Sequence, residues 1–119
     1  FGPWHGGIVG FLGHLASAFT SGFALGWIHL VVAIQMYIAC WVFGRIIRMI
    51  DRVWALVLAF VVAVMLNGVV APLFLGAMGL IPMQVAYGLM GILSFASAVN
   101  AGLAIIAIRI FARRQTNSF

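Results

Sequence analysis

This chain of 119 residues has almost no charge: one acidic residue, Asp51, and six basic residues, all of them arginine. It contains no lysine and no glutamate, and Cys40 is its one cysteine. A soluble domain carries charged side chains over its whole surface, so this composition excludes one. The missing lysine excludes a phosphate-binding loop, and a single cysteine excludes an intrachain disulfide. We therefore expect a chain that is not an enzyme, uses no cofactor and cannot hydrolyse ATP by itself.

Apolar residues make up 66% of the chain, and its few charges fall into two clusters. The first cluster contains Arg45, Arg48, Asp51 and Arg52, and the second contains Arg109, Arg113 and Arg114. Long uncharged runs are stable in lipid, and one spanning helix needs about 20 apolar residues. The sequence therefore predicts an all-α integral membrane bundle, a single membrane domain over residues 1–119 with about four transmembrane helices. The expected spans are 5–20, 28–44, 53–71 and 83–111, the third ending before Pro72.

The arginine clusters also predict an orientation. Arginines in short segments next to span ends stay on the cytoplasmic side, which places both clusters and the C-terminus inside. The turns near residues 21–27 and 76–81 then face outward. Segment 5–20 is short and rich in glycine, and it starts inside if it crosses the membrane. The chain begins without methionine and without a signal-peptide pattern, so we expect it to be part of a longer protein.

Several kinds of chemistry are not expected of this sequence. No acidic residue lies inside an expected span, whereas ion-coupled carriers keep an ionisable group in mid-membrane. The arginines stand at span ends and form no basic run interleaved with aromatic residues, so no nucleic-acid partner is expected. His5, His14 and His29 are isolated in the sequence, without a nearby carboxylate or thiolate, so no metal site is predicted.

Polar residues inside the spans share one end of the bundle. With about 1.5 Å of rise per residue, Asn67 falls in the outer half, and His29, Gln84 and Tyr87 fall near the outer rim beside Trp27. Polar groups that converge between apolar walls indicate a small-molecule pocket. The predicted substrate-binding residues are therefore Trp27, His29, Asn67, Gln84 and Tyr87. The alternative is that the amides form interhelical hydrogen bonds and the aromatic residues belong to an interfacial belt.

A second set of candidate functional residues consists of small residues at helical spacing. Gly6 and Gly10 follow the G-x-x-x-G pattern, and Ser97 and Ala101 give another narrow helix face. Such faces let the backbone of another helix approach closely. We predict that these four residues dock on a partner protein. Ordinary helix packing is the alternative for the glycine pair.

Three segments of the chain resemble one transporter family. Residues 1–14 read F-G-P-W-H-G-G-I-V-G-F-L-G-H, which is similar to the F-G-P-x-x-G-x-x-V-G-x-L-G segment of the S components of energy-coupling factor (ECF) transporters. Residues 66–73, L-N-G-V-V-A-P-L, resemble the N-G-x-x-A-P-L of their fifth span. Residues 96–101, A-S-A-V-N-A, are similar to the A-S-x-x-N-A of their last span. The order and spacing of these motifs over almost the whole chain carry the resemblance.

The resemblance implies a six-helix S component, of which this chain holds the last four helices and lacks the first two. It implies a prokaryotic cytoplasmic membrane and a vitamin or vitamin precursor as the ligand. The implied partners are a transmembrane coupling subunit and two cytoplasmic ATPases, which agrees with the missing nucleotide motif. Two alternatives stay open: a small structural or accessory subunit of a larger membrane complex, and a component of transition-metal uptake.

Overall fold

The computed structural model describes residues 2–49 and 53–116, and this part of the chain contains helices and no strand. The helices are α1 (Pro3–Thr20), α2 (Ile28–Met49), α3 (Val53–Met65), η1 (Leu66–Val70), α4 (Ala71–Ala77) and α5 (Met83–Thr116). η1 is a short π-helix that joins α3 and α4 into one continuous rod. The expectation of an all-helical fold is confirmed.

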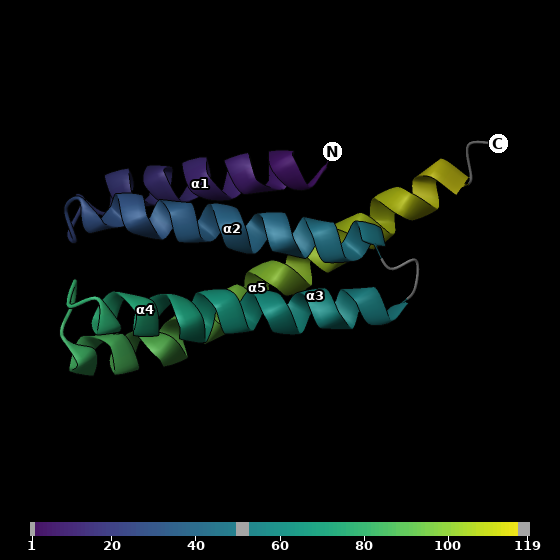
Figure 1. The fold of residues 1–119 in the computed structure, drawn as a ribbon. Helices are drawn as coiled ribbons and strands as arrows, with labels where there is room; N and C mark the ends of the chain where they lie inside the picture. The colour runs from purple at the N-terminus through teal and green to yellow at the C-terminus, as the bar shows by residue number, and fades with distance from the viewer. Residues whose placement is uncertain (1, 50–52, 117–119) are drawn as a thin grey trace.

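Figure 1 shows how the helices are arranged: α1 packs along α2, the α3–α4 rod lies beside α2, and α5 crosses the bundle diagonally. The start of α1, the end of α2, the start of α3 and the end of α5 lie at one end of the bundle. The turns that precede α2 and α5 lie at the other end. The helix ends next to both arginine clusters are therefore on the same side, as the sequence predicts. Asp51 and Arg52 themselves lie outside the described residues.

Three helical segments are long and apolar enough to cross a membrane. They are Ile28–Met49 with 22 residues, Val53–Ala77 with 25 and Met83–Phe111 with 29. α1 is not among them. The chain thus has the helices of a multi-pass membrane protein. α5 has 34 residues, and at about 1.5 Å per residue it is longer than a hydrocarbon core of about 30 Å, so it must tilt or protrude.

The packing places small residues inside and large apolar residues outside. Eight of the ten buried hydrophobic residues in the described part of the chain are alanines. Phe19, Trp54 and Phe95 are each at least 74% exposed. Small residues let helices approach closely, and large apolar side chains are stable against lipid. Larger buried side chains occur at the turn end of the bundle, where Leu75 and Ile81 pack together.

The third rod continues through Pro72 to Ala77, although the sequence predicts its end before Pro72. Proline has no N–H group, so it leaves one carbonyl of the preceding turn without a donor. η1 comes directly before this position, and the N–H of Ala71 bonds to the carbonyl of Leu66, five residues back. The wider π-helical turn therefore lets the rod accommodate Pro72 without ending there.

Candidate functional site

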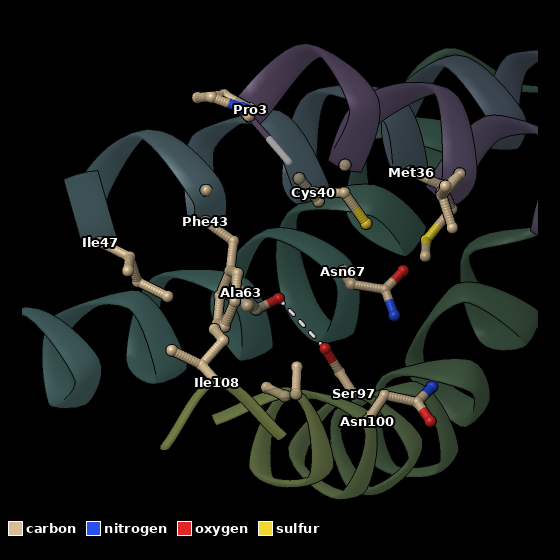
Figure 2. A pocket seen from close by; sticks show the side chains of 18 of the residues that line it. Pro3, Met36, Cys40, Phe43, Ile47, Ala63, Asn67, Ser97, Asn100 and Ile108 are labelled. Atoms are coloured by element: carbon tan, nitrogen blue, oxygen red, sulfur yellow. Dashed lines mark hydrogen bonds between the residues drawn. The ribbon is translucent and has the colours of Figure 1, made fainter. Parts of the chain in front are cut away.

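A cavity of about 500 Å³ lies between α1, α2, the α3–η1 junction and α5 (Figure 2). We call it the larger cavity. This volume falls within the range of small-molecule pockets, about 300–1,000 Å³. Its walls are mainly apolar. They come from residues between 2 and 10, from residues between 36 and 48, from Ala63 and Asn67, and from residues between 97 and 108.

Three polar side chains stand together in the larger cavity. Asn67 extends from η1 toward α5, which carries Ser97 and Asn100 (Figure 2). The hydroxyl of Ser97 donates a hydrogen bond of 3.2 Å to the carbonyl of Ala63 and so links α5 to α3. Ser97 is buried, whereas Asn100 is exposed. Each amide can donate and accept hydrogen bonds, so the two asparagines can together pair with a polar edge of a ligand.

The close approach of η1 to α5 positions Asn67. Gly68, the next residue, is buried, and a Cβ on it would lie 2.6 Å from the Cα of Ser94. Glycine is required there because a backbone atom cannot move aside as a side chain does. The π-helical turn adds a residue to the helix and changes the direction of its side chains, and such turns are frequent at functional sites. Both features bring the Asn67 amide over α5.

Arg48 is the one charged residue among those that line the larger cavity. It stands beside the start of α1, since a Cβ on Gly2 would lie 3.0 Å from its Nη1 atom. The N-terminal end of α1 also has a partial positive charge. No acidic residue is part of the lining among the described residues, which do not include Asp51. A cation would be poorly solvated here without a counter-charge, so the cavity suits a neutral or anionic small molecule.

A second cavity of about 330 Å³ lies between α2 and the η1–α4 part of the rod. Apolar residues such as Ile34, Ile38 and Phe74 form most of its wall. Gln35 also lines it, and Oε1 of Gln35 is buried without a hydrogen-bond partner among the described residues. This cavity holds no group of converging polar side chains, so the larger cavity is the better candidate for a ligand site.

The structure separates the five predicted substrate-binding residues. Asn67 lines the larger cavity, but Trp27, His29, Gln84 and Tyr87 line neither of the two cavities. Trp27 is 67% exposed and Tyr87 is 61% exposed, and Gln84 is exposed as well. The two aromatic residues have the exposure that an interfacial belt requires. A ligand role for these four residues stays a prediction.

The predicted docking residues, Gly6, Gly10, Ser97 and Ala101, all line the larger cavity. A Cβ on Gly10 would lie 2.6 Å from Sγ of Cys40 and 2.9 Å from the carbonyl oxygen of Met36. The narrow face of Gly10 is therefore used by α1 for packing on α2. Ser97 and Ala101 are buried as well. Docking on a separate subunit stays a prediction, and packing within the chain already explains Gly10, Ser97 and Ala101.

One contact could not be predicted from the sequence, in which His14 and His29 are isolated from each other. Nε2 of His14 lies 3.3 Å from Nδ1 of His29, because α1 and α2 run antiparallel on either side of the turn at 21–27. If residues 5–20 and 28–44 are aligned as an antiparallel helical hairpin, His14 and His29 come close together. This alignment is the signal that could have predicted their contact. Within residues 2–49 and 53–116, no group of three or more His, Cys, Asp or Glu side chains could hold a metal ion.

The three segments that resemble S components meet at the larger cavity. Pro3 and Gly10 belong to the first segment, Asn67 to the second, and Ser97 and Asn100 to the third. Comparisons with protein-family models, with curated proteins and with solved structures find no match for this chain. The residues themselves and their positions in the fold are therefore the basis for a function.

Proposed function

We propose that this chain is the substrate-capture subunit, or S component, of an ATP-driven importer of the ECF type. In this proposal a vitamin or vitamin precursor binds in the larger cavity, where Asn67 and Asn100 form hydrogen bonds with it. A transmembrane coupling subunit and two cytoplasmic ATPases supply the energy. The chain lies in a prokaryotic cytoplasmic membrane with four spans, of which α1 is the first, and with its C-terminus inside.

The observation that supports this proposal most is the meeting of three distant motif segments at one cavity. Asn67 and Asn100 are 33 positions apart in the sequence, yet they line the same space. An apolar cavity with a few converging polar groups is the usual form of a small-molecule site. Among the residues that the structure describes, Arg48 is the charged residue of the lining and none is acidic, which favours a ligand without net positive charge.

Thermal unfolding of the purified chain in detergent tests this proposal. A ligand that binds only the folded state raises the Tm by mass action. We expect a rise with at least one of three probes that carry no net positive charge, namely riboflavin, biotin and pantothenate. Thiamine, which is cationic, is the matched probe and should give no rise. A chain that none of these probes stabilises, and that copurifies with no small molecule by mass spectrometry, would contradict the proposal.

The second candidate is a structural or accessory subunit of a larger membrane complex. It is favoured by the small residues that line the larger cavity, among them Gly6, Ala39 and Ala104, because they admit the backbone of a further helix. In that case the cavity is filled by protein, and no probe changes the Tm. A cysteine at Ala104 in a Cys40→Ser background would then crosslink to a partner helix in native membranes.

A further inference from the structure

His14 and His29 connect the α1–α2 turn to α1 through two linked hydrogen bonds. The N–H of Leu25 donates to Nε2 of His29 over 3.3 Å, and Nδ1 of His29 lies 3.3 Å from Nε2 of His14. A backbone N–H can only donate, so Nε2 of His29 has no proton, and in the neutral ring Nδ1 has it. This Nδ1–H then donates to an unprotonated Nε2 of His14. When both rings are neutral, this is the one combination of tautomers that satisfies both hydrogen bonds.

The same ring supports a turn whose backbone is strained. Phe23 packs edge-on against His29, with the ring centroids 5.8 Å apart. Its φ of +50° lies in the left-handed region, which is unfavourable for a bulky residue. Residues 21–27 are all exposed, whereas His29 is only 8% exposed. Backbone hydrogen bonds also order the turn, among them the one of 2.8 Å from the N–H of Phe23 to the carbonyl of Ala18. The buried His29 ring adds the hydrogen bond from Leu25 and the contact with Phe23.

One added proton disrupts this arrangement in every possible state. The pair then has three protons on four ring nitrogens, so one nitrogen is unprotonated. If that nitrogen is Nε2 of His29, an N–H of His14 faces an N–H of His29. If it is any of the other three, the N–H at Nε2 of His29 faces the N–H of Leu25. At least one of the two hydrogen bonds is lost in each case.

No other group that titrates in the acidic range stands next to the pair along the elements packed there. On α1, His5 precedes His14 by nine residues, about 13 Å along the helix. On α2 the next titratable residue is Tyr37, and Cys40, Arg45 and Arg48 lie further on. The turn at 21–27 and the α3–α4 rod contain none. The first titratable residue of α5 is Tyr87, a phenol, which does not ionise in acid.

We propose that His14 and His29 form a proton-sensitive latch, which adds to the backbone hydrogen bonds that hold residues 21–27 on α1 when both rings are neutral, and which loosens this turn when the pair takes up one proton. Since protonation costs the latch a hydrogen bond, the closed turn is favoured when both rings are neutral and is weakened as the pH falls. This inference is independent of the proposed ligand, because the larger cavity is lined by neither the pair nor the turn.

Hydrogen–deuterium exchange of the chain in lipid nanodiscs tests the latch. After correction for the chemical exchange rate, we expect the amides of residues 22–27 to exchange about fivefold faster at pH 5.5 than at pH 7.5, as the loss of one hydrogen bond allows. His29→Gln has no titrating ring, although its amide oxygen can still accept from Leu25, so this variant should lose the pH dependence. The control on α1, His5→Gln, should keep it.

A second measurement uses the unaltered chain with ¹⁵N-labelled histidine. At pH 7.5 we expect NMR spectra that show both His14 and His29 as Nδ1–H tautomers. The pair should take up its proton in the same pH range in which exchange at the turn rises. The proposal is wrong if exchange at the turn does not change between pH 7.5 and 5.5, or if His29 has its proton on Nε2. It is also wrong if zinc ions at pH 7.5 bind the pair and displace these protons, because the two rings would then be metal ligands.

Discussion

Gly68 lies against Ser94 so closely that a Cβ on Gly68 would be 2.6 Å from the Cα of Ser94. This contact holds η1 against α5 and so fixes the position of Asn67. Gly68→Ala should push the two helices apart, because a backbone atom cannot move out of the way. We expect the unfolding free energy to fall by about 1–3 kcal/mol, the usual cost of overpacking. Equilibrium unfolding in mixed detergent micelles measures it.

Gly102→Ala is the matched control on α5, since nothing lies within 4 Å of a Cβ built there. Alanine has a higher helix propensity than glycine, so this variant should be as stable as the wild type or more stable. Equal midpoints for Gly68→Ala and Gly102→Ala would show that η1 can move away from α5 at no cost.

The hydrogen bond from Ser97 to the carbonyl of Ala63 links α5 to α3 inside the bundle. Ser97→Ala removes the donor, and hydrogen bonds between membrane helices are worth about 0.6–1.7 kcal/mol. We expect a loss of that size in the same unfolding experiment. Ser17→Ala, at an exposed position on α1, should leave the midpoint unchanged. If both serine variants unfold at the wild-type midpoint, this bond does not contribute to stability.

Substitutions at Gly10 and Gly13 test whether the small residues of α1 pack on α2 or dock on a separate protein. A Cβ on Gly10 would meet Cys40 and the backbone of Met36, whereas nothing lies within 4 Å of one on Gly13. Gly10→Leu should therefore separate α1 from α2 and lower the unfolding midpoint. Gly13→Leu should not. A stable Gly10→Leu chain that no longer copurifies with a coupling subunit would instead support docking through Gly10.

The fold could be predicted from the sequence because the signals for it are local. Uncharged runs define the helices, and arginine clusters indicate which helix ends lie together. The continuation through Pro72 could not be predicted, because it depends on the π-helical turn just before it. That turn is stabilised by packing against α5, where Gly68 meets Ser94, and a helical pattern contains no information on such contacts.

The candidate site was only partly predictable for a related reason. Rise per residue gives the depth of a side chain, but depth does not say which way the helix faces. Tyr87 and Gln84 share an end of the bundle with His29, yet they are on exposed faces of α5. Asn67 was identified because it is polar inside a span. Ser97 and Asn100 line the same cavity, but the sequence placed Ser97 on a docking face and Asn100 only in a motif of the family resemblance.

The orientation of the chain can be measured by labelling single cysteines in intact cells. In a Cys40→Ser background, Met49→Cys and Gln115→Cys lie near the two arginine clusters. We expect both to be protected from an impermeant maleimide added outside, because arginine clusters next to span ends favour the cytoplasmic side. Met78→Cys, in the exposed turn before α5, should be labelled. Efficient labelling at Met49→Cys or Gln115→Cys would reverse the proposed topology.

Asn67 and Tyr87 distinguish between a ligand in the larger cavity and a ligand at the turn end. Asn67 lines the cavity, whereas Tyr87 is 61% exposed and lines neither cavity. With the probe that raises the Tm, we expect Asn67→Ala to weaken affinity about tenfold, which corresponds to one lost hydrogen bond of about 1.4 kcal/mol. Tyr87→Ala should change affinity less than about twofold, as expected for a residue without ligand contact.

The opposite result would have an equally clear meaning. If Tyr87→Ala weakens binding and Asn67→Ala does not, the ligand lies near the outer rim, as the depth of the polar residues predicts. The capture function would then survive, but the larger cavity would be a space for a partner helix. Asn100→Ala tests the larger cavity from its other side, because Asn100 lines the cavity from α5. A loss of affinity in both Asn67→Ala and Asn100→Ala requires a ligand that contacts η1 and α5 together, and only the larger cavity allows that.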